Sequence, residues 1–313
     1  MKTLQKTAIS TAAVALLAGL STVAFAADEP AAAEVSPITA NVTVASNYIY
    51  RGLTQTNNKP AIQGGFDYAH ESGFYVGNWN SNISWISDQY GGGTGPNGKS
   101  YAGSGTGSVT APIEMDFYAG FKKELIGEGF ASDFGVLQYY YPVSGMFANA
   151  PTAAQIQAYP TARQSSGASP STTEIYAAQN FTAGSVTGFL KFSYAVSNLF
   201  GIYNSKGSFY PDLTANYDTG FYGIGLVGHV GYQYVPNNIV VAANSATAMP
   251  GTYNLSYADW KFGFTKDFGG GLSGTAYYTG TSVQKVGSTY MYSTPNGGNQ
   301  GRANAVVALT KTF

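Results

Sequence analysis

The stretch IEMDFYAGFK, residues 113–122, decides the fold because apolar and polar residues alternate along it. Successive side chains of a β-strand point to opposite faces, so this stretch has one apolar and one polar face. About ten residues with this pattern are typical of a tilted strand that crosses a membrane in a barrel. The apolar face holds Ile113, Met115, Phe117 and Phe121, and the other face holds Glu114, Asp116, Tyr118 and Lys122.

Similar stretches follow one another from Thr39 to Phe313, separated by turn residues. We count about twelve, an even number as bacterial barrels require, with ten or fourteen as alternatives because residues 132–141 alternate poorly. Three further stretches define predicted faces. In the first, at residues 42–51, the apolar face holds Val42, Val44, Tyr48 and Tyr50, and the polar face holds Asn41, Thr43, Asn47 and Arg51. In the second, at residues 75–85, the apolar face holds Tyr75, Trp79, Ile83 and Trp85, and the polar face holds Asn78, Asn80, Asn82 and Ser84. In the third, at residues 259–265, the apolar face holds Trp260, Phe262 and Phe264, and the polar face holds Asp259, Lys261 and Thr265.

Connection lengths separate a membrane barrel from a soluble sandwich, which would show the same alternation. Short turns such as 71–73, 183–185 and 218–220 alternate with long connections at 87–111, 142–171, 235–252 and 282–302. Short periplasmic turns and long outer loops are the bacterial barrel pattern. Aromatic residues near strand ends predict girdles at the membrane boundaries: Tyr48, Tyr50, Tyr139 to Tyr141, Tyr232, Tyr234 and Phe268. The sequence therefore predicts an all-β, closed antiparallel transmembrane β-barrel.

The first residues predict export. Lys2 and Lys6 precede an apolar run that ends at the A-x-A site 24–26, which is the order of a cleaved secretory signal peptide. We expect a signal peptide at 1–26, a flexible periplasmic leader at 27–38 and the barrel at 39–313. Export through the Sec route would place the chain in the outer membrane of a Gram-negative bacterium.

Composition excludes several classes. The chain has no Cys, so it has no lipoprotein anchor, disulfide or thiolate metal site. No run of 18 apolar residues follows residue 26, which excludes a helical membrane protein. Cleavage would leave 13 basic against 16 acidic residues, which gives no electrostatic case for binding nucleic acid.

Two stretches resemble a known family. GFYVGNWNSNI, residues 73–83, is similar to the G-x-Y-x-G-x-W-x-S-N-[VI] motif of the Gcw_chp family, also called the TorF family of porins. ASNYIYRG, residues 45–52, resembles the same family's S-x-Y-x-[FY]-R-G start. The resemblance implies an outer-membrane barrel of porin type without a known solute. The final strand ends in Phe313, which looks like the signal read by the outer-membrane assembly machinery.

Motifs for catalysis are weak. GTGPNGKS, residues 93–100, fits a phosphate-binding loop, but the Gly- and Ser-rich residues after it disfavour the helix that such a loop needs. Neither His70 nor His229 has the spacing of a Ser/His hydrolase or a zinc site. We expect no enzyme activity, no cofactor and no metal.

The strand phases predict a polar interior in which acids outnumber bases. Rings of Asp and Glu favour cations, so we expect a porin-like channel for small polar solutes with a mild cation preference. A closed structural or adhesive barrel and a barrel hydrolase are the alternatives. The predicted pore-lining residues are Arg51, Asp67, Asn78, Asn80, Asn82, Glu114, Asp116, Lys122, Glu174, Lys191, Asp212, His229, Asp259 and Lys261, with Glu71 and Asp218 as further inward acids.

Overall fold

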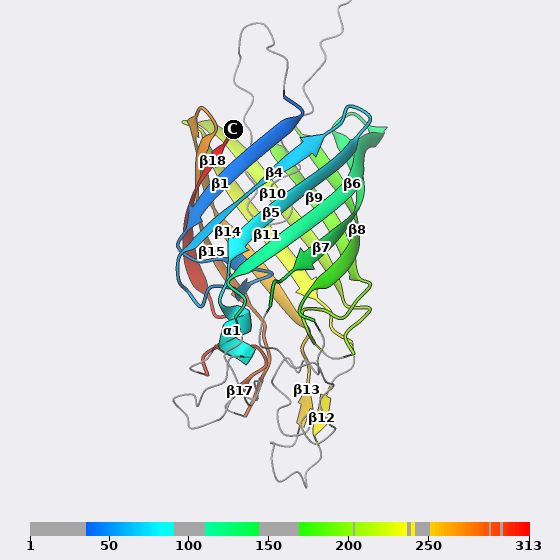
Figure 1. The fold of residues 1–313 in the computed structure, drawn as a ribbon. Coiled ribbons are helices and arrows are strands. Elements are labelled where there is room, and N and C mark those ends of the chain that lie inside the picture. Colours follow the sequence, from blue (N-terminus) through cyan, green and yellow to red (C-terminus); the bar gives the residue numbers. More distant parts are fainter. Residues whose placement is uncertain are drawn as a thin grey trace, which may run out of the picture.

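Twelve antiparallel strands close into a barrel in the computed structural model of the chain (Figure 1). The structure describes residues 36–90, 110–143, 169–202, 204–236, 239–241, 251–287, 289–294 and 297–313. The predicted signal peptide at 1–26 and the stretch 93–100 lie outside these residues. The barrel strands are β1 (Ile38–Ala45), β4 (Ala61–Ala69), β5 (Phe74–Asn82), β6 (Ile113–Gly127), β7 (Phe130–Tyr140), β8 (Thr172–Ala183), β9 (Val186–Ala195), β10 (Phe209–Phe221), β11 (Ile224–Gln233), β14 (Tyr257–Gly269), β15 (Leu272–Thr281) and β18 (Asn304–Thr312).

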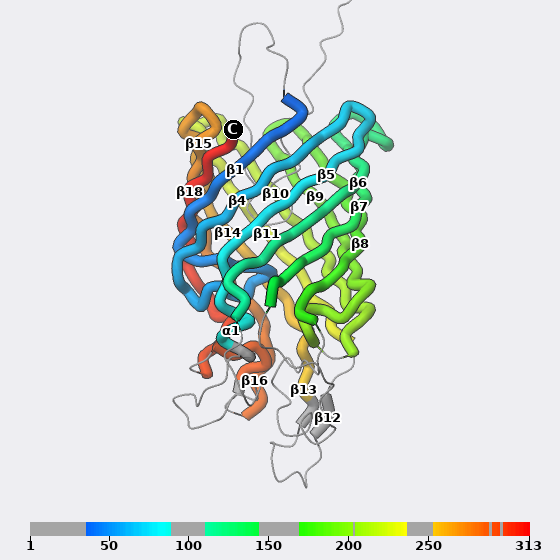
Figure 2. The backbone as a smooth tube through the Cα atoms, in the orientation of Figure 1, coloured from blue at the N-terminus to red at the C-terminus, as the bar shows by residue number. Residues whose placement is uncertain are grey.

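Each barrel strand pairs with the next barrel strand along the chain, and β1 closes the barrel against β18. Thr43 pairs with Thr310 at this seam, and their hydroxyls lie 2.8 Å apart. Closure leaves no strand edge, which is what a sheet needs where no water can satisfy backbone groups. The beginning of β1 and the C-terminus lie at the same end, which also carries the short turns (Figure 2). We call this the short-turn end and the opposite one the long-loop end.

The long-loop end carries the remaining elements (Figure 1). They are the helix α1 (Trp85–Tyr90) and three small two-stranded sheets, of which β2 (Ile49–Tyr50) with β3 (Leu53–Thr54) matters most for the site. The other two pair β12 (Ile239–Val241) with β13 (Gly251–Tyr253) and β16 (Lys285–Val286) with β17 (Thr289–Tyr290). In the part of the chain that the structure describes, no helix has the length and apolar character needed to cross a membrane.

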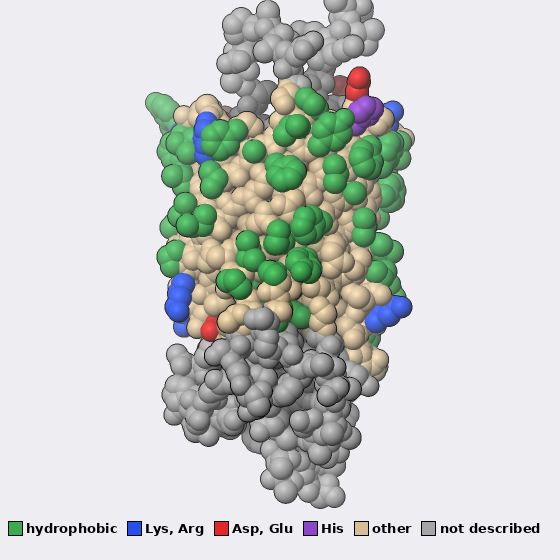
Figure 3. Space-filling model, viewed as in Figure 1, with side chains coloured by type: hydrophobic (Ala, Val, Ile, Leu, Met, Phe, Trp, Pro, Cys, Tyr) green, Lys and Arg blue, Asp and Glu red, His purple; other side chains and the backbone are tan. Residues whose placement is uncertain are grey.

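The outer face of the barrel is apolar. Large hydrophobic side chains are solvent-accessible along the strands, including Phe66 at 56% and Phe262 at 55%. Charged side chains visible in Figure 3 gather toward the two ends, with apolar and uncharged groups between them. An apolar band flanked by charges suits a hydrocarbon layer. The predicted outward residues of β6 and β14 lie on the outer face, as do Tyr232, Tyr234 and Phe268, which were expected in the girdles.

Strand β5 has the opposite phase to the one predicted. Tyr75 and Trp79 point into the barrel and are buried, whereas Asn78, Asn80 and Asn82 lie on the outer face. The register shows this directly, because Asn78 pairs with the outward-facing Phe66. The outward amides find partners on the sheet itself: Asn78 Nδ2 donates to the Asp116 carbonyl, and Asn80 Nδ2 donates to Asn78 Oδ1.

An inward tyrosine needs a small neighbour, and β6 supplies one. A Cβ added at Gly120 would lie 2.4 Å from the hydroxyl oxygen of Tyr75. Glycine therefore leaves room for the ring to lie across the adjacent strand. Alternation defines two faces of the strand, but the hydrogen bonds of the outward asparagines and the space left at Gly120 decide which face meets lipid.

The prediction that residues 46–51 continue the first strand was wrong. Strand β1 ends at Ala45, and the following chain turns into the barrel as the β2–β3 hairpin. Tyr48 is only 2% exposed and donates to Glu114, so it belongs to the interior and not to a girdle. Tyr139 and Tyr141 are buried as well, and only Tyr140 of that trio faces outward.

Candidate functional site in the barrel interior

A hairpin inside the barrel forms the centre of the candidate site. The connection between β1 and β4 folds inward, and the turn of its β2–β3 hairpin is Arg51-Gly52. Both residues have positive φ angles, 45° and 75°. This is a two-residue hairpin turn, in which an arginine at the first position is unusual. The cost of that conformation is offset by the contacts that the Arg51 side chain makes.

Arg51 joins the hairpin to the opposite wall. Its guanidinium nitrogens contact the two Glu174 carboxylate oxygens of β8 at 3.0 and 2.7 Å, and Nη1 also donates to Gln233 Oε1 of β11 at 2.6 Å. The guanidinium lies 4.3 Å from the ring centre of Tyr210 of β10. Burial lowers the pKa of Arg51, but the Glu174 carboxylate together with the Tyr50 and Tyr139 hydroxyls raises it by more, so the pKa lies above its usual range. The ion pair is buried, with side-chain exposures of 6% and 2%.

The wall formed by β4 to β7 carries four buried acids, Asp67, Glu114, Asp116 and Asp133. Three of them accept tyrosine hydroxyls. Tyr48 and Tyr141 donate to Glu114 at 2.5 and 2.6 Å, Tyr118 donates to Asp67 at 2.5 Å, and Tyr75 donates to Asp133 at 2.6 Å. Burial, followed by the Glu114 carboxylate, raises the pKa values of Tyr48 and Tyr141, which keeps these hydroxyls as donors.

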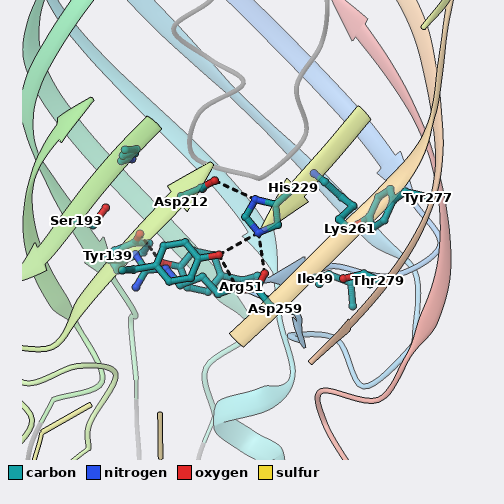
Figure 4. Close-up of a pocket in the computed structure, with 14 residues that line it drawn as sticks. Ile49, Arg51, Tyr139, Ser193, Asp212, His229, Asp259, Lys261, Tyr277 and Thr279 are labelled. Carbon is teal, nitrogen blue, oxygen red and sulfur yellow. Dashed lines mark hydrogen bonds and ion pairs between the residues drawn. The ribbon is translucent and has the colours of Figure 1, made fainter. Parts of the chain in front are cut away.

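The wall formed by β10, β11 and β14 places a histidine between two carboxylates (Figure 4). His229 Nδ1 lies 2.9 Å from Asp212 Oδ1, and Nε2 lies 2.8 Å from Asp259 Oδ2. Tyr210 adds a hydroxyl that donates to Asp259 at 2.8 Å. The register explains the grouping, since β11 lies between β10 and β14 and all three side chains point inward.

A cavity lies between the hairpin turn and this wall. The side chains that line it come from the hairpin and from β7, β9, β10, β11, β14 and β15. Its charged lining residues are Arg51, Lys191, Asp212, His229, Asp259 and Lys261.

The long-loop end of the interior is filled by apolar side chains. Trp85 and Ile86 of α1, Leu53 of the hairpin, and Leu199 and Phe200 of the β9–β10 connection are all buried in one cluster. The ring of Trp85 packs edge-on against that of Phe200, with centres 6.5 Å apart. A smaller space remains between this cluster and the hairpin. The described loops thus narrow the barrel at this end.

Most of the predicted pore-lining residues lie inside the barrel. Three do not, because Asn78, Asn80 and Asn82 face outward, and Glu71, also expected inward, is exposed in the turn after β4. The residues that lie inside are Arg51, Asp67, Glu114, Asp116, Lys122, Glu174, Lys191, Asp212, His229, Asp259 and Lys261.

Sequence reasoning missed several interior residues. Asp133 was overlooked because residues 132–141 alternate poorly, although β7 puts it inside opposite Lys122. The inward tyrosines Tyr139 and Tyr210 carry no charge to mark them. A glycine one strand away is the available signal, since a Cβ at Gly231 would lie 2.1 Å from the Tyr210 hydroxyl oxygen.

Two other features bear on catalysis and metal binding: a His/Ser contact and the grouping of possible metal ligands. His70 Nδ1 and Ser72 Oγ lie 2.8 Å apart in the exposed turn after β4, where His70 Nδ1 also accepts the Ser72 backbone N–H. This is a local turn contact two residues apart. Among the residues with described positions, no group of three or more His, Asp or Glu side chains could hold a metal ion.

A closed antiparallel barrel with an apolar outer face and a charged interior defines the class as a porin-like outer-membrane β-barrel. The chain belongs to the Gcw_chp family, described as a bacterial protein of unknown function, which matches residues 29–313. No curated protein sequence matches it.

Among solved structures, the KdgM porin is similar at 4% identity, with 88% of this chain and 98% of that one covered and a TM-score of 0.46. The NanC porin is similar at 7% identity, with 88% and 98% covered and a TM-score of 0.45. The Pseudomonas putida toluene transporter TodX is similar at 11% identity, with 88% of each chain covered and a TM-score of 0.42.

Proposed function

We propose that the protein is an outer-membrane channel through which small polar solutes diffuse passively. The observation that carries this proposal is the cavity inside the barrel, lined by charged and hydroxyl-bearing side chains. A barrel of this strand number is narrower than sixteen-stranded porins, and the inward hairpin narrows it further. The channel would therefore be selective by size.

The orientation follows from the loops and the ends. Export through the Sec route in a Gram-negative bacterium would deliver the chain to the periplasm, and the assembly machinery would read the last strand ending in Phe313. The short-turn end, which holds Phe313, would face the periplasm and the long-loop end the outside. The apolar cluster of α1 and Phe200 would then stand at the outer mouth.

A mild cation preference is a second part of the proposal. The described interior holds seven acids against four lysine and arginine side chains, and acidic linings favour cations. The acids are Asp67, Glu114, Asp116, Asp133, Glu174, Asp212 and Asp259, and the bases are Arg51, Lys122, Lys191 and Lys261. A KCl gradient across a planar bilayer tests it: a reversal potential of cation sign is expected, and one at zero or of anion sign refutes it.

A closed structural barrel is the competing function, and one observation favours it. Trp85, Ile86, Leu199 and Phe200 fill the long-loop end in the way that a protein core is filled. Single-channel recording separates the two functions. A channel gives discrete current steps, whereas a closed barrel gives none over many insertions, even after the hairpin residues 47–57 are replaced by a short Gly/Ser linker.

A further inference from the structure

Cationic side chains outnumber carboxylates in the lining of the cavity beside the hairpin. Four cationic side chains line it, Arg51, Lys191, His229 and Lys261, but only two carboxylates, Asp212 and Asp259. Figure 4 shows the His229 ring directed at both carboxylates, with Arg51 on one side of them and Lys261 on the other. The groups available to a solute depend on which of these charges the protein already pairs.

Both lining carboxylates are engaged. The two ring nitrogens of His229 lie 2.9 and 2.8 Å from Asp212 and Asp259, and donation to both requires two N–H groups, which only the protonated ring has. The Thr214 hydroxyl donates to Asp212 Oδ1 at 2.9 Å, and Tyr210 donates to Asp259. Arg51 is likewise held by Glu174 and Gln233.

Lys191, unlike Arg51, makes no direct ion-pair contact among the described residues. It is 6% exposed, and in the described portion of the chain no carboxylate lies within 4 Å of its ammonium group. Its ammonium lies 4.2 Å from the ring centre of Tyr176. The carboxylates of Glu174, Asp212 and Asp133 act on this ammonium from beyond 4 Å. A ligand carboxylate in direct contact would supply the close, charge-assisted partner that the described residues do not. Ser193, two residues further along the same face of β9, lines the same cavity.

We propose that this cavity binds the carboxylate of a small monoanionic organic acid, with Lys191 as its ion-pair partner. The proposal rests on the channel function above and names a class of solute for it. Ser193 and the tyrosines Tyr139 and Tyr210 provide hydroxyls at the cavity wall for a hydroxylated acid.

The acidic wall lies outside the lining of the cavity. Asp67, Glu114, Asp116 and Asp133 belong to β4, β6 and β7 and do not line the cavity. Three of them accept tyrosine hydroxyls. Asp133 and Asp116 act on the Lys191 ammonium electrostatically without contacting it within 4 Å, so they leave room for a ligand carboxylate at closer range.

Gluconate is the probe. Calorimetry on the full mature chain in detergent should show binding of sodium gluconate, and gluconate should reduce the KCl current through single channels. Lys191→Gln should weaken both effects roughly 10- to 100-fold, the contribution of a hydrogen bond to a charged group. Lys191→Arg should keep them within a few-fold. Lys206→Gln, at an exposed loop lysine, is the matched control and should bind as the wild type does.

The outcomes are distinct. Wild-type binding that is lost in Lys191→Gln and kept in Lys206→Gln supports the site. No binding to the wild type, or equal binding to Lys191→Gln, overturns it, even if the protein conducts ions normally. Gluconate binding without any ion current would instead overturn the channel function and leave the site standing.

Discussion

The contact between Arg51 and Glu174 should hold the hairpin inside the barrel, and Arg51→Ala tests this. The substitution removes two contacts to Glu174 and one to Gln233, and it leaves a buried carboxylate without its partner. Removing one member of a buried ion pair costs about 3–5 kcal/mol. Because 1.36 kcal/mol corresponds to a factor of ten, release of the hairpin should become easier by roughly 150- to 5,000-fold.

Planar-bilayer recording of the purified full chain measures the result. We expect Arg51→Ala to show a larger single-channel conductance and a higher open probability than the wild type. Glu174→Gln should change both in the same direction by less, because it keeps the shape of the side chain. Arg302→Ala, at an exposed arginine of the last long connection, is the control and should behave as the wild type does.

Wild-type conductance in both variants would show that this contact does not hold the hairpin across the pore. If Arg51→Ala and Glu174→Gln both form folded barrels, checked by circular dichroism, and both conduct as the wild type does, the hairpin does not limit the pore. If Arg51→Ala fails to fold, the comparison of Glu174→Gln with the wild type still decides the question.

Three further predictions concern the barrel itself. Gly120→Val should lower the free energy of unfolding in detergent by about 1–3 kcal/mol, because the added Cβ would meet the Tyr75 hydroxyl at 2.4 Å. Gly228→Ala, with open space around it, should change this free energy by less than about 0.5 kcal/mol, and equal changes in the two variants would contradict the packing of Tyr75 against Gly120. A nitroxide attached at Asn80→Cys should collide with lipid-soluble oxygen as often as one at Val42→Cys. More frequent collision with a water-soluble relaxation agent would show that Asn80 faces the barrel interior, as the sequence predicted. Phe262→Lys on the outer face should destabilise the folded barrel in bilayers by about 2–4 kcal/mol if it lies near the midplane, and a neutral effect would place it outside the membrane.

The sequence predicted the architecture because alternation is a strong physical signal over ten residues. Along residues 113–122 each inward residue and each outward residue lies where the pattern put it. The strand number followed from counting such stretches. Asp67, Glu114 and Asp259 were placed inside because a charged side chain in lipid is costly.

Two features were beyond the sequence. Alternation cannot tell the two faces of β5 apart when the outer one holds asparagines that bond to the sheet and the inner one holds Tyr75 and Trp79. Nor can it show where a strand ends if the following loop also alternates, as in residues 46–51. The hairpin depends on contacts between Arg51 and Glu174, which are 123 positions apart in the chain.

Single-channel recording of the unmodified mature protein decides whether the barrel conducts ions. We expect small, discrete current steps in KCl that grow when residues 47–57 are replaced by a short Gly/Ser linker. Many insertions without current, both before and after that replacement, would contradict this expectation and show that the barrel is closed.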